Sequence, residues 1–183
     1  ANNLPAAQAQ VKERLTQRLR LEQDLYRYPQ IRQEKIERPI FVVGYSRTGT
    51  TVMHSLLGED PASRTPLFWE STLFSPPEGI DPASAREQKR AADRECQDWV
   101  DAVPGILSAH PYWDLGANTP IEDEEIFSVD FHNAYPTHHY KVPFSPLDTT
   151  AADPLPAYEF LKTFLQYRQF NMSGKRWVCK GVF

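Results

Sequence analysis

The chain has 183 residues, of which 40% are hydrophobic and 24% charged, as is ordinary for a globular protein with one buried core. Its net charge of −4 argues against a protein that binds nucleic acid through general electrostatics. The chain has only two cysteines, Cys96 and Cys179, which fits a reducing compartment. No apolar stretch is long enough to span a membrane. We therefore expect a cytoplasmic protein.

The chain opens with a predicted helix at residues 5–27, which Pro29 ends because the residue before a proline is disfavoured in helical conformation. Its apolar side chains fall into two stripes at helical spacing. The first stripe is Val11, Leu15 and Leu19, and the second is Leu21, Leu25 and Tyr28. The sequence therefore predicts a helix that packs on two sides. We expect residues 1–37 to form an N-terminal helical extension packed on a single domain that spans residues 1–183.

A short apolar run from Pro39 to Val43 predicts a fully buried strand of a parallel sheet. Gly44 opens a loop that ends at Thr51. Apolar residues then recur at helical spacing and predict a helix, with Gly58 at its C-terminal cap. These residues are Val52, Met53, Leu56 and Leu57. Strand, glycine-bounded loop and helix together frame an anion site, because loop N–H groups and the helix dipole favour negative charge there.

The side chains of the loop add hydrogen-bond donors to this frame. Arg47 supplies a guanidinium, and four hydroxyls accompany it. The hydroxyls belong to Ser46, Thr48, Thr50 and Thr51. The spacing from Gly44 to Gly49 is that of a nucleotide-triphosphate loop, but Thr50 stands where such a loop has its lysine. A loop without that lysine is poorly equipped to transfer a γ-phosphoryl group, although it can hold a smaller dianionic group.

Several further elements are predicted downstream of this helix. They are a proline-rich connector at 60–77, a helix from 81 to 103, an irregular stretch at 106–121, helices at 122–135 and 153–170, and a strand at 176–180. Asp81 followed by Pro82 is a strong helix start, since aspartate caps the free N–H groups and proline suits the first helical position. The acidic run from Glu122 to Glu125 is expected to be a solvated helix start. Two strands separated by a long helical stretch predict an α/β fold with parallel strands.

The loop sequence Ser46-Arg47-Thr48-Gly49-Thr50-Thr51 resembles a known motif. It is similar to the 5′-phosphosulfate loop of the sulfotransferases that use 3′-phosphoadenosine 5′-phosphosulfate (PAPS), roughly P-[KR]-[ST]-G-T-[TS], with Ser46 in place of the proline. The similarity to one bacterial branch of that family continues through most of the chain. It covers Arg64 to Glu70, Ser75 to Pro77, His110-Pro111, Glu122 to Glu125 and Lys175 to Lys180.

This resemblance implies a P-loop-type three-layer α/β fold with a parallel central sheet and a largely helical insertion. It implies transfer of a sulfonate from PAPS to a hydroxyl of a small molecule, sugar or lipid, without a metal. Arg47 and Lys180 would lie at the phosphosulfate, although Gly181 and Val182 after Lys180 depart from the usual Lys-Ser-Pro continuation. The remaining nucleotide-binding residues implied are Thr48, Gly49, Thr50 and Thr51.

The resemblance also offers candidates for the base that removes the acceptor's proton. In related bacterial enzymes a glutamate at the place of Glu70 has this role, so Glu70 is predicted to be catalytic together with Arg47. Cytosolic eukaryotic relatives use a histidine instead. The histidines available are His54, His110, His132, His138 and His139. His54 is as readily a packing residue as a proton carrier, and His110 is expected to shape the acceptor pocket. The pair at 138–139 lacks carboxylate or cysteine partners at metal-ligand spacing.

Aromatic residues are expected to line an apolar acceptor pocket. They are Phe68, Trp69, Phe74, Tyr112 and Trp113. Two alternatives stay open: a P-loop kinase or NTPase, and a non-catalytic nucleotide-binding relative. Both ends of the sequence look cut, so we expect an N-terminal portion whose 3′-phosphate site lies beyond Phe183. The sequence leaves a homo-oligomer open.

Overall fold

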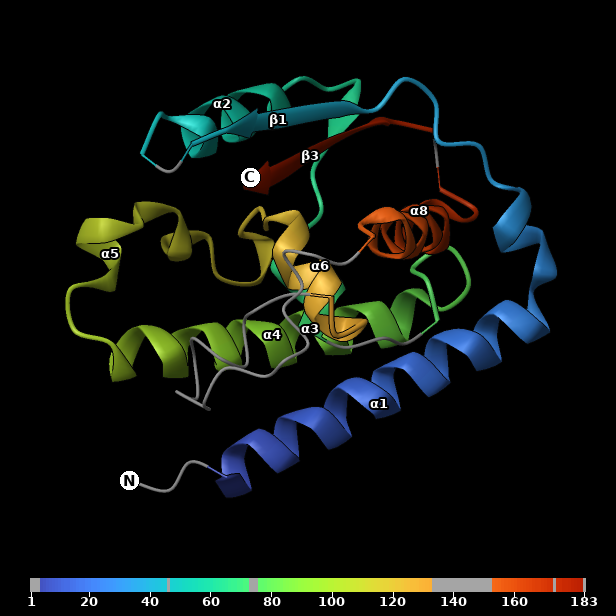
Figure 1. Ribbon diagram of the computed structural model, residues 1–183, viewed down its shortest axis with the longest axis horizontal. Coiled ribbons are helices and arrows are strands. Elements are labelled where there is room, and N and C mark those ends of the chain that lie inside the picture. The colour runs from blue at the N-terminus through green and yellow to red at the C-terminus, as the bar shows by residue number, and fades with distance from the viewer. Residues whose placement is uncertain (1–3, 46, 73–75, 133–152, 173, 183) are drawn as a thin grey trace.

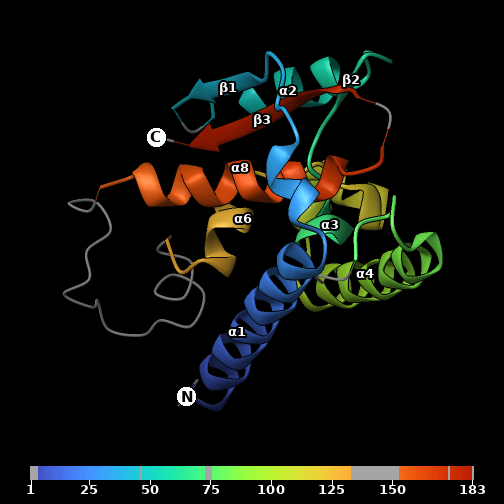
Figure 2. The same ribbon diagram turned by 90° about the vertical axis from the view of Figure 1, so that its right-hand side faces the viewer.

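The computed structural model describes residues 4–45, 47–72, 76–132, 153–172 and 174–182. In this part of the chain three parallel strands form a sheet in the order β1-β3-β2. Helix α2 (Thr50–Gly58) lies on one side of the sheet and helix α8 (Leu155–Gln169) on the other (Figures 1 and 2). The predicted layered α/β fold with parallel strands is therefore confirmed. The strands are β1 Ile40–Gly44, β2 Ser63–Arg64 and β3 Arg176–Val182.

The register of β1 and β3 decides which side chains meet at the loop. Val42 pairs with Lys180, and Gly44, where β1 ends, pairs with Val182. Because the strands are parallel, their carboxyl ends lie at the same edge of the sheet, which is where ligands bind in open α/β sheets. The sheet thus brings the loop that follows β1 and the end of β3 together, although 130 or so residues separate them in sequence.

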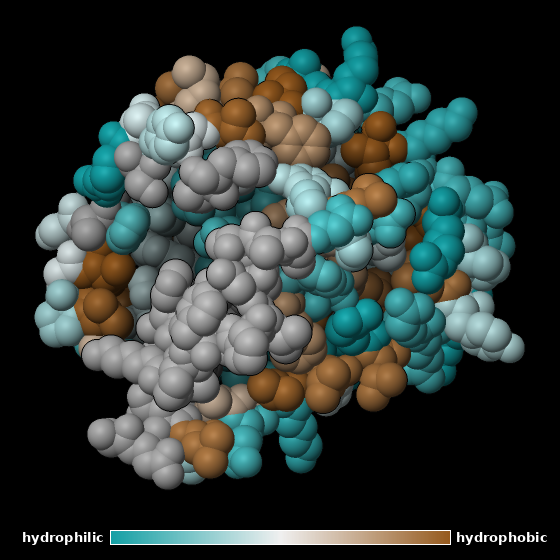
Figure 3. All heavy atoms as spheres, viewed as in Figure 1, coloured by the Kyte–Doolittle hydropathy of each residue, from teal (hydrophilic) through white to brown (hydrophobic). Residues whose placement is uncertain are grey.

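Strand β1 is not fully buried, contrary to the sequence prediction. Val42 faces the interior, but Phe41 is 43% exposed and Val43 56% exposed. The reason is that β1 pairs only with β3 in the described residues, so one edge and much of one face have no partner there. Apolar residues of α2 are exposed as well, among them Val52 and Leu56. Figure 3 shows hydrophobic residues on the surface over β1 and α2.

The predicted helices form, with boundaries close to those expected. Helix α4 begins after Asp81, whose carboxylate accepts hydrogen bonds from the N–H groups of Ala83 and Ser84, both at 3.1 Å. Asp153 accepts a bond from the N–H of Leu155 (3.0 Å) at the start of α8. The helix predicted over 122–135 ends sooner, at Val129, and its last three residues lie outside the described part. The helices concerned are α4 Pro82–Ala102 and α6 Asp123–Val129.

The sequence missed four short elements in stretches predicted to be a connector or irregular. Local patterns do not reveal them, because each is only two to eight residues long and is fixed by its tertiary neighbours. Strand β2, for example, pairs with Arg176 and Trp177 of β3. The missed elements are β2, α3 Phe68–Thr72, α5 Ile106–Ala109 and the 3-10 helix η2 Pro111–Asn118.

Helix α1 (Leu4–Arg27) buries one of its two predicted stripes. Leu21 is 1% exposed, whereas Leu19 is 72% exposed, and Val11 and Leu15 are also exposed. The prediction of packing on two sides is therefore wrong. Figure 2 shows the reason: the C-terminal half of α1 reaches the 3-10 helix η1 (Pro29–Gln33) and the body, while the N-terminal half projects away.

The main apolar core lies between the sheet and the helices on the α8 side of the sheet. It is built by α8, α6, β3 and the end of α1. Two polar contacts anchor the same elements: the buried Tyr167 hydroxyl donates to Asp24 Oδ2 (2.8 Å), and the partly exposed Arg18 pairs with Asp130 (2.5 Å). The core residues include Leu21, Leu25, Ile31, Ile121, Ile126, Val129, Leu161, Phe164, Leu165, Tyr167 and Trp177.

Candidate active site

The loop between β1 and α2 has a backbone that depends on residues in left-handed conformation. Gly49 has φ of +89°, and Arg47, which is not a glycine, has φ of +67°. A non-glycine residue in this region is strained, and such strain is concentrated at functional sites. A Cβ at Gly44 would lie 2.9 Å from Thr50 Cγ2 and 3.0 Å from Thr48 Oγ1. The two glycines thus let the loop close tightly over the start of α2.

This loop fits a phosphate or sulfate group. Among the described residues, no side chain caps the N-terminus of α2, so its first N–H groups and the positive end of its dipole face outward. Arg47 and Thr48 are exposed beside them. The hydroxyl of Thr48 donates to the carbonyl of Tyr45 (2.7 Å), and this hydrogen bond holds the loop closed. The Thr48 oxygen can then only accept further hydrogen bonds. Ser46 lies outside the described residues.

Lys180 connects the loop to the interior. Its side chain is 4% exposed, and its Nζ donates to Thr51 Oγ1 of α2 (3.0 Å). The same ammonium forms an ion pair with Glu122, the residue at the start of α6. Lys180 therefore lies beside the first turn of the loop helix, with its charge balanced by one carboxylate.

The acidic run at the start of α6 is not a solvated helix start, and this sequence prediction is wrong. Asp123 is 1% exposed, and burial raises its pKa to about 7. Burial also raises the pKa of Glu125. Asp123 turns inward because the N–H of Lys180 donates to it, and the neighbouring Glu122 pairs with the Lys180 ammonium, whereas Glu124 stays exposed. Sequence reasoning missed Glu122 as a site residue, because no local pattern indicates its contact with Lys180, 58 positions away.

Glu70 lies in a different environment. Its side chain is 1% exposed; one carboxylate oxygen accepts a bond from Arg64 and the other from the N–H of Leu67 (2.9 Å). Arg64 stacks on the ring of Trp177 at 4.1 Å, and Arg168 donates to the backbone carbonyl of Glu70. None of these partners belongs to the loop. The geometry resembles a structural ion pair, and the catalytic role of Glu70 stays a prediction.

The described histidines each have a defined partner. The Nε2 atom of His54 lies 3.0 Å from the carbonyl oxygen of Val178, and burial lowers the pKa of this ring, so it is neutral and holds α2 on β3. His110 Nδ1 lies 2.9 Å from the hydroxyl of Tyr112, and His132 Nδ1 lies 2.7 Å from Asp130. His138 and His139 lie outside the described residues.

The aromatic residues predicted to line an acceptor pocket divide into two groups. The ring of Trp113 contacts Phe68 edge-on at 5.3 Å and lies 6.1 Å from Tyr112, so these three gather in space. Trp69 instead belongs to the interior, where Arg168 lies 5.5 Å from its ring. Phe74 lies outside the described residues.

A small cavity of about 70 Å³ joins these features. It lies between α2, η2 and α6, directly beside the loop helix. Its walls combine aromatic rings, two carboxylates and the ammonium of Lys180. The lining residues are Thr51, His54, Ser55, Tyr112, Trp113, Pro120, Ile121, Glu122, Glu125 and Lys180.

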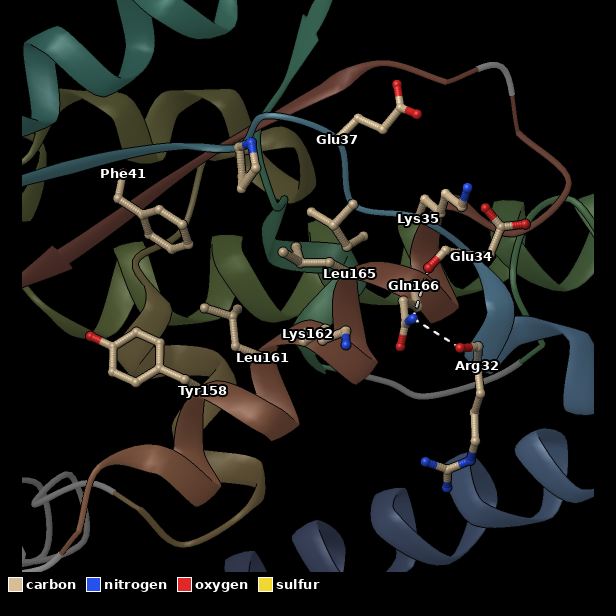
Figure 4. A pocket seen from close by; sticks show the side chains of 12 residues that line it. Arg32, Glu34, Lys35, Glu37, Phe41, Tyr158, Leu161, Lys162, Leu165 and Gln166 are labelled. Atoms are coloured by element: carbon tan, nitrogen blue, oxygen red, sulfur yellow. Dashed lines mark hydrogen bonds between the residues drawn. The ribbon is translucent and has the colours of Figure 1, made fainter.

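A larger cavity of about 620 Å³ lies on the other side of the sheet, away from the loop. Figure 4 shows Phe41 of β1 on one side of it and Tyr158, Leu161 and Leu165 of α8 on the other. Gln166 ties its rim together by donating to the carbonyls of Arg32 (3.1 Å) and Glu34 (2.8 Å). None of the predicted site residues lines this cavity, whereas Thr51 and Lys180 line the smaller one.

Two features that would suggest other classes of protein are missing from the described residues. No group of three histidine, cysteine, aspartate or glutamate side chains is arranged there to hold a metal ion. None of the helices in this part of the chain is both long enough and apolar enough to cross a membrane.

The strained glycine loop, the uncapped helix start and the lysine of a parallel strand together form a candidate anion site on a P-loop-type α/β fold. The model of the Sulfotransferase family matches residues 39–165, most of the chain. The chain therefore belongs to the sulfotransferase family. None of the curated proteins compared with the chain matches it.

Two solved structures share this fold. The sulfotransferase STF9 from Mycobacterium avium has 27% identity and a TM-score of 0.74 over 96% of this chain and 44% of its own. The sulfotransferase STF1 from Mycobacterium tuberculosis H37Rv has 24% identity and a TM-score of 0.68 over 93% of this chain and 46% of its own. The chain thus spans less than half the length of either structure.

Proposed function

We propose that the protein transfers a sulfonate group from PAPS to an acceptor hydroxyl. The observation that carries the proposal is the junction at Lys180, whose ammonium contacts both Thr51 of the loop helix and Glu122 of α6. It brings an anion-binding loop, a cation and a carboxylate together beside one small cavity. The family match supports the reaction class. The sequence pattern around Arg64 and Glu70 supports the bacterial branch of the family.

The loop residues would hold the 5′-phosphosulfate. Arg47 and the N–H groups of Gly49, Thr50 and Thr51 supply donors around a dianionic group, and Thr48 shapes the loop. Lys180 would stabilise the charge that develops as the bond between sulfur and the bridging oxygen breaks. These roles need no metal ion, because the cations are side chains of the chain itself.

The acceptor's proton needs a base near the attacking oxygen. Glu122 fits this role better than Glu70, because it lines the cavity beside Thr51 and Lys180. The two oxygens of Glu70 already accept bonds from Arg64 and the N–H of Leu67. We therefore propose Glu122 as the base and keep Glu70 as the competing candidate, which the variants discussed below distinguish.

A kinase or NTPase is the less well supported alternative. The position after Gly49 is Thr50, so the loop offers no lysine to a γ-phosphate. The family match also favours sulfonate over phosphoryl transfer. A binding module that kept the loop and lost turnover remains a defined alternative, and it would bind nucleotide without transferring sulfonate.

Calorimetric titration with adenosine 3′,5′-bisphosphate, compared with ATP, tests the donor class. We expect the bisphosphate to bind and ATP to bind at least tenfold more weakly. A preference for ATP would overturn the sulfotransferase proposal in favour of the kinase. Sulfonate transfer from PAPS, followed in the same preparation, separates an enzyme from a binding module.

We also propose a reducing compartment, the cytoplasm, as the location. Cys96 and Cys179 are both buried free thiols, and burial raises the pKa of Cys96. A raised pKa keeps a thiol protonated and unreactive. Detection of the protein in a cytoplasmic rather than a secreted fraction would test this.

A further inference from the structure

The cavity beside the loop is too narrow for an aromatic ring. Its volume is about 70 Å³, whereas a protein cavity of about 150 Å³ is known to accommodate benzene. A hydroxyl on one methylene fits this space. The ring of a phenol, whose oxygen is attached directly to the aromatic carbon, does not.

The walls that make the cavity narrow are well supported. Trp113 is held by rings on three sides: Phe68 at 5.3 Å, Trp99 at 4.8 Å and Tyr112 at 6.1 Å. Tyr112 is in turn fixed by the 2.9 Å contact between its hydroxyl and His110. Widening the cavity would therefore require several packed rings to move together, which interior packing opposes.

The charges around the cavity select against negatively charged acceptors. Glu122 and Glu125 both line it, one helical turn apart on α6. Burial and these two carboxylates raise the pKa of Tyr112, whereas Arg47 lowers it. Tyr112 therefore lies between the carboxylates of α6, on the side proposed for the acceptor, and Arg47 of the loop, on the side proposed for PAPS. An uncharged hydroxyl can donate to a carboxylate here, while a phenolate would be repelled.

From these observations we propose that the acceptor is an uncharged alcohol that presents a hydroxymethyl group to the cavity between α2, η2 and α6. This inference rests on the proposed sulfotransferase function and narrows its acceptor class. The alcohol oxygen forms a bond to sulfur, and its proton passes to Glu122. The bond between sulfur and the bridging oxygen of PAPS breaks, and its electron pair stays on the phosphate of adenosine 3′,5′-bisphosphate. The rest of the acceptor stays outside, against Tyr112 and Trp113.

Two acceptors that differ by one methylene test the proposal: 4-nitrobenzyl alcohol and 4-nitrophenol. The first can insert its hydroxymethyl group and leave its ring outside, whereas the second must bring its ring into the cavity. With PAPS as donor, we expect kcat/KM to be at least tenfold higher for the benzyl alcohol. Equal values, or a preference for the phenol, would overturn the proposal.

Variants then test whether Trp113 sets this preference. Trp113→Ala removes most of one wall and should reduce the ratio of kcat/KM values at least threefold by admitting the phenol. Trp113→Leu is the second variant, in case the alanine variant does not fold. Tyr26→Phe, at an 89% exposed tyrosine of α1, should keep the wild-type ratio. An unchanged ratio in both folded Trp113 variants would contradict the role of this wall.

Titration with adenosine 3′,5′-bisphosphate distinguishes failure of the proposed sulfotransferase function from failure of the acceptor inference. If the bisphosphate does not bind to the full-length protein, which would include the expected 3′-phosphate site, the proposed sulfotransferase function fails. If it binds but neither acceptor is sulfonated, or both are sulfonated equally, only the acceptor inference fails.

Discussion

Glu70 and Glu122 each pair with a cation, but the side chain of Glu70 is 1% exposed and that of Glu122 is 32% exposed. Glu70 pairs with Arg64 between α3 and β2, and Glu122 pairs with Lys180 between α6 and β3. The first pair is contacted by Leu67, Trp177 and Arg168, none of which belongs to the loop. The second is linked to the loop through Thr51 and opens on the small cavity. Only the second pair contacts the loop helix, and this is why we propose Glu122 rather than Glu70 as the base.

The largest expected effect is on turnover in Glu122→Gln. A general base contributes about 10²–10⁴-fold, so kcat for sulfonate transfer should fall on the order of 1,000-fold. Binding of adenosine 3′,5′-bisphosphate should change much less, because Lys180 and the loop stay in place. Initial rates at saturating PAPS, with calorimetry of the same protein, measure both. Full activity in this variant would remove Glu122 from the mechanism.

A second effect of the same region is on stability against pH. Burial raises the folded-state pKa of Asp123 from 3.8 to about 7, so the native protein holds a proton that the unfolded chain has lost. The stabilising contribution of this proton is complete below pH 3.8 and is lost as the pH rises to about 7. A shift of this size corresponds to at most ~4 kcal/mol.

Asp123→Asn should abolish that pH-dependent loss, because asparagine keeps the shape and an oxygen acceptor but does not ionise. Urea unfolding at pH 4.5 and pH 8 should then show the variant gaining stability over the wild type only at the higher pH. Asp98→Asn, at an exposed aspartate of α4, is the matched control. A wild-type pH dependence in Asp123→Asn would show that another group, such as Glu125, is responsible.

The pair of Glu70 and Arg64 should respond differently. Glu70→Gln leaves Arg64 buried without its carboxylate, and breaking a buried pair costs about 3–5 kcal/mol. We expect a loss near the lower end, about 3 kcal/mol in the free energy of unfolding, since the Arg64 side chain is 18% exposed. Turnover of the folded fraction should fall less than in Glu122→Gln. Loss of turnover on the order of 100-fold with unchanged stability would instead restore Glu70 as the base.

Local patterns predicted the elements whose cause is local. The glycines at 44 and 49, the cap at Asp81 and the apolar run of β1 each specify a conformation within a few residues, and the structure has them where expected. The pairing of Lys180 with Glu122 has no such cause. These residues are 58 positions apart and meet because α6 packs against β3. The burial of Asp123 follows from the same long-range contact.

The same distinction explains the two wrong burial predictions. An apolar stripe shows that a helix face can be buried, but the partner decides whether it is. Among the described residues of α1, Leu21 and Leu25 are the ones that enter the apolar core. Strand β1 reads as buried because it is apolar throughout. Its face at Phe41 and Val43 lacks a cover in the described residues. Sequence composition thus predicted which surfaces favour burial, and the tertiary contacts determined which of them are buried.

The smallest expected effect is at the loop itself, where one of several donors is removed. Arg47→Ala should weaken binding of adenosine 3′,5′-bisphosphate by about 2 kcal/mol, or roughly 30-fold, because a charge-assisted contact is lost while the N–H groups of α2 remain. Calorimetry of this variant should be compared with Arg20→Ala, an exposed arginine of α1 far along the chain from the loop, which should bind as the wild type does. Near-normal affinity in Arg47→Ala would show that the loop does not bind the nucleotide through Arg47. The contrast between the two carboxylates would then lose its basis, since Glu122 is distinguished from Glu70 by its link to that loop.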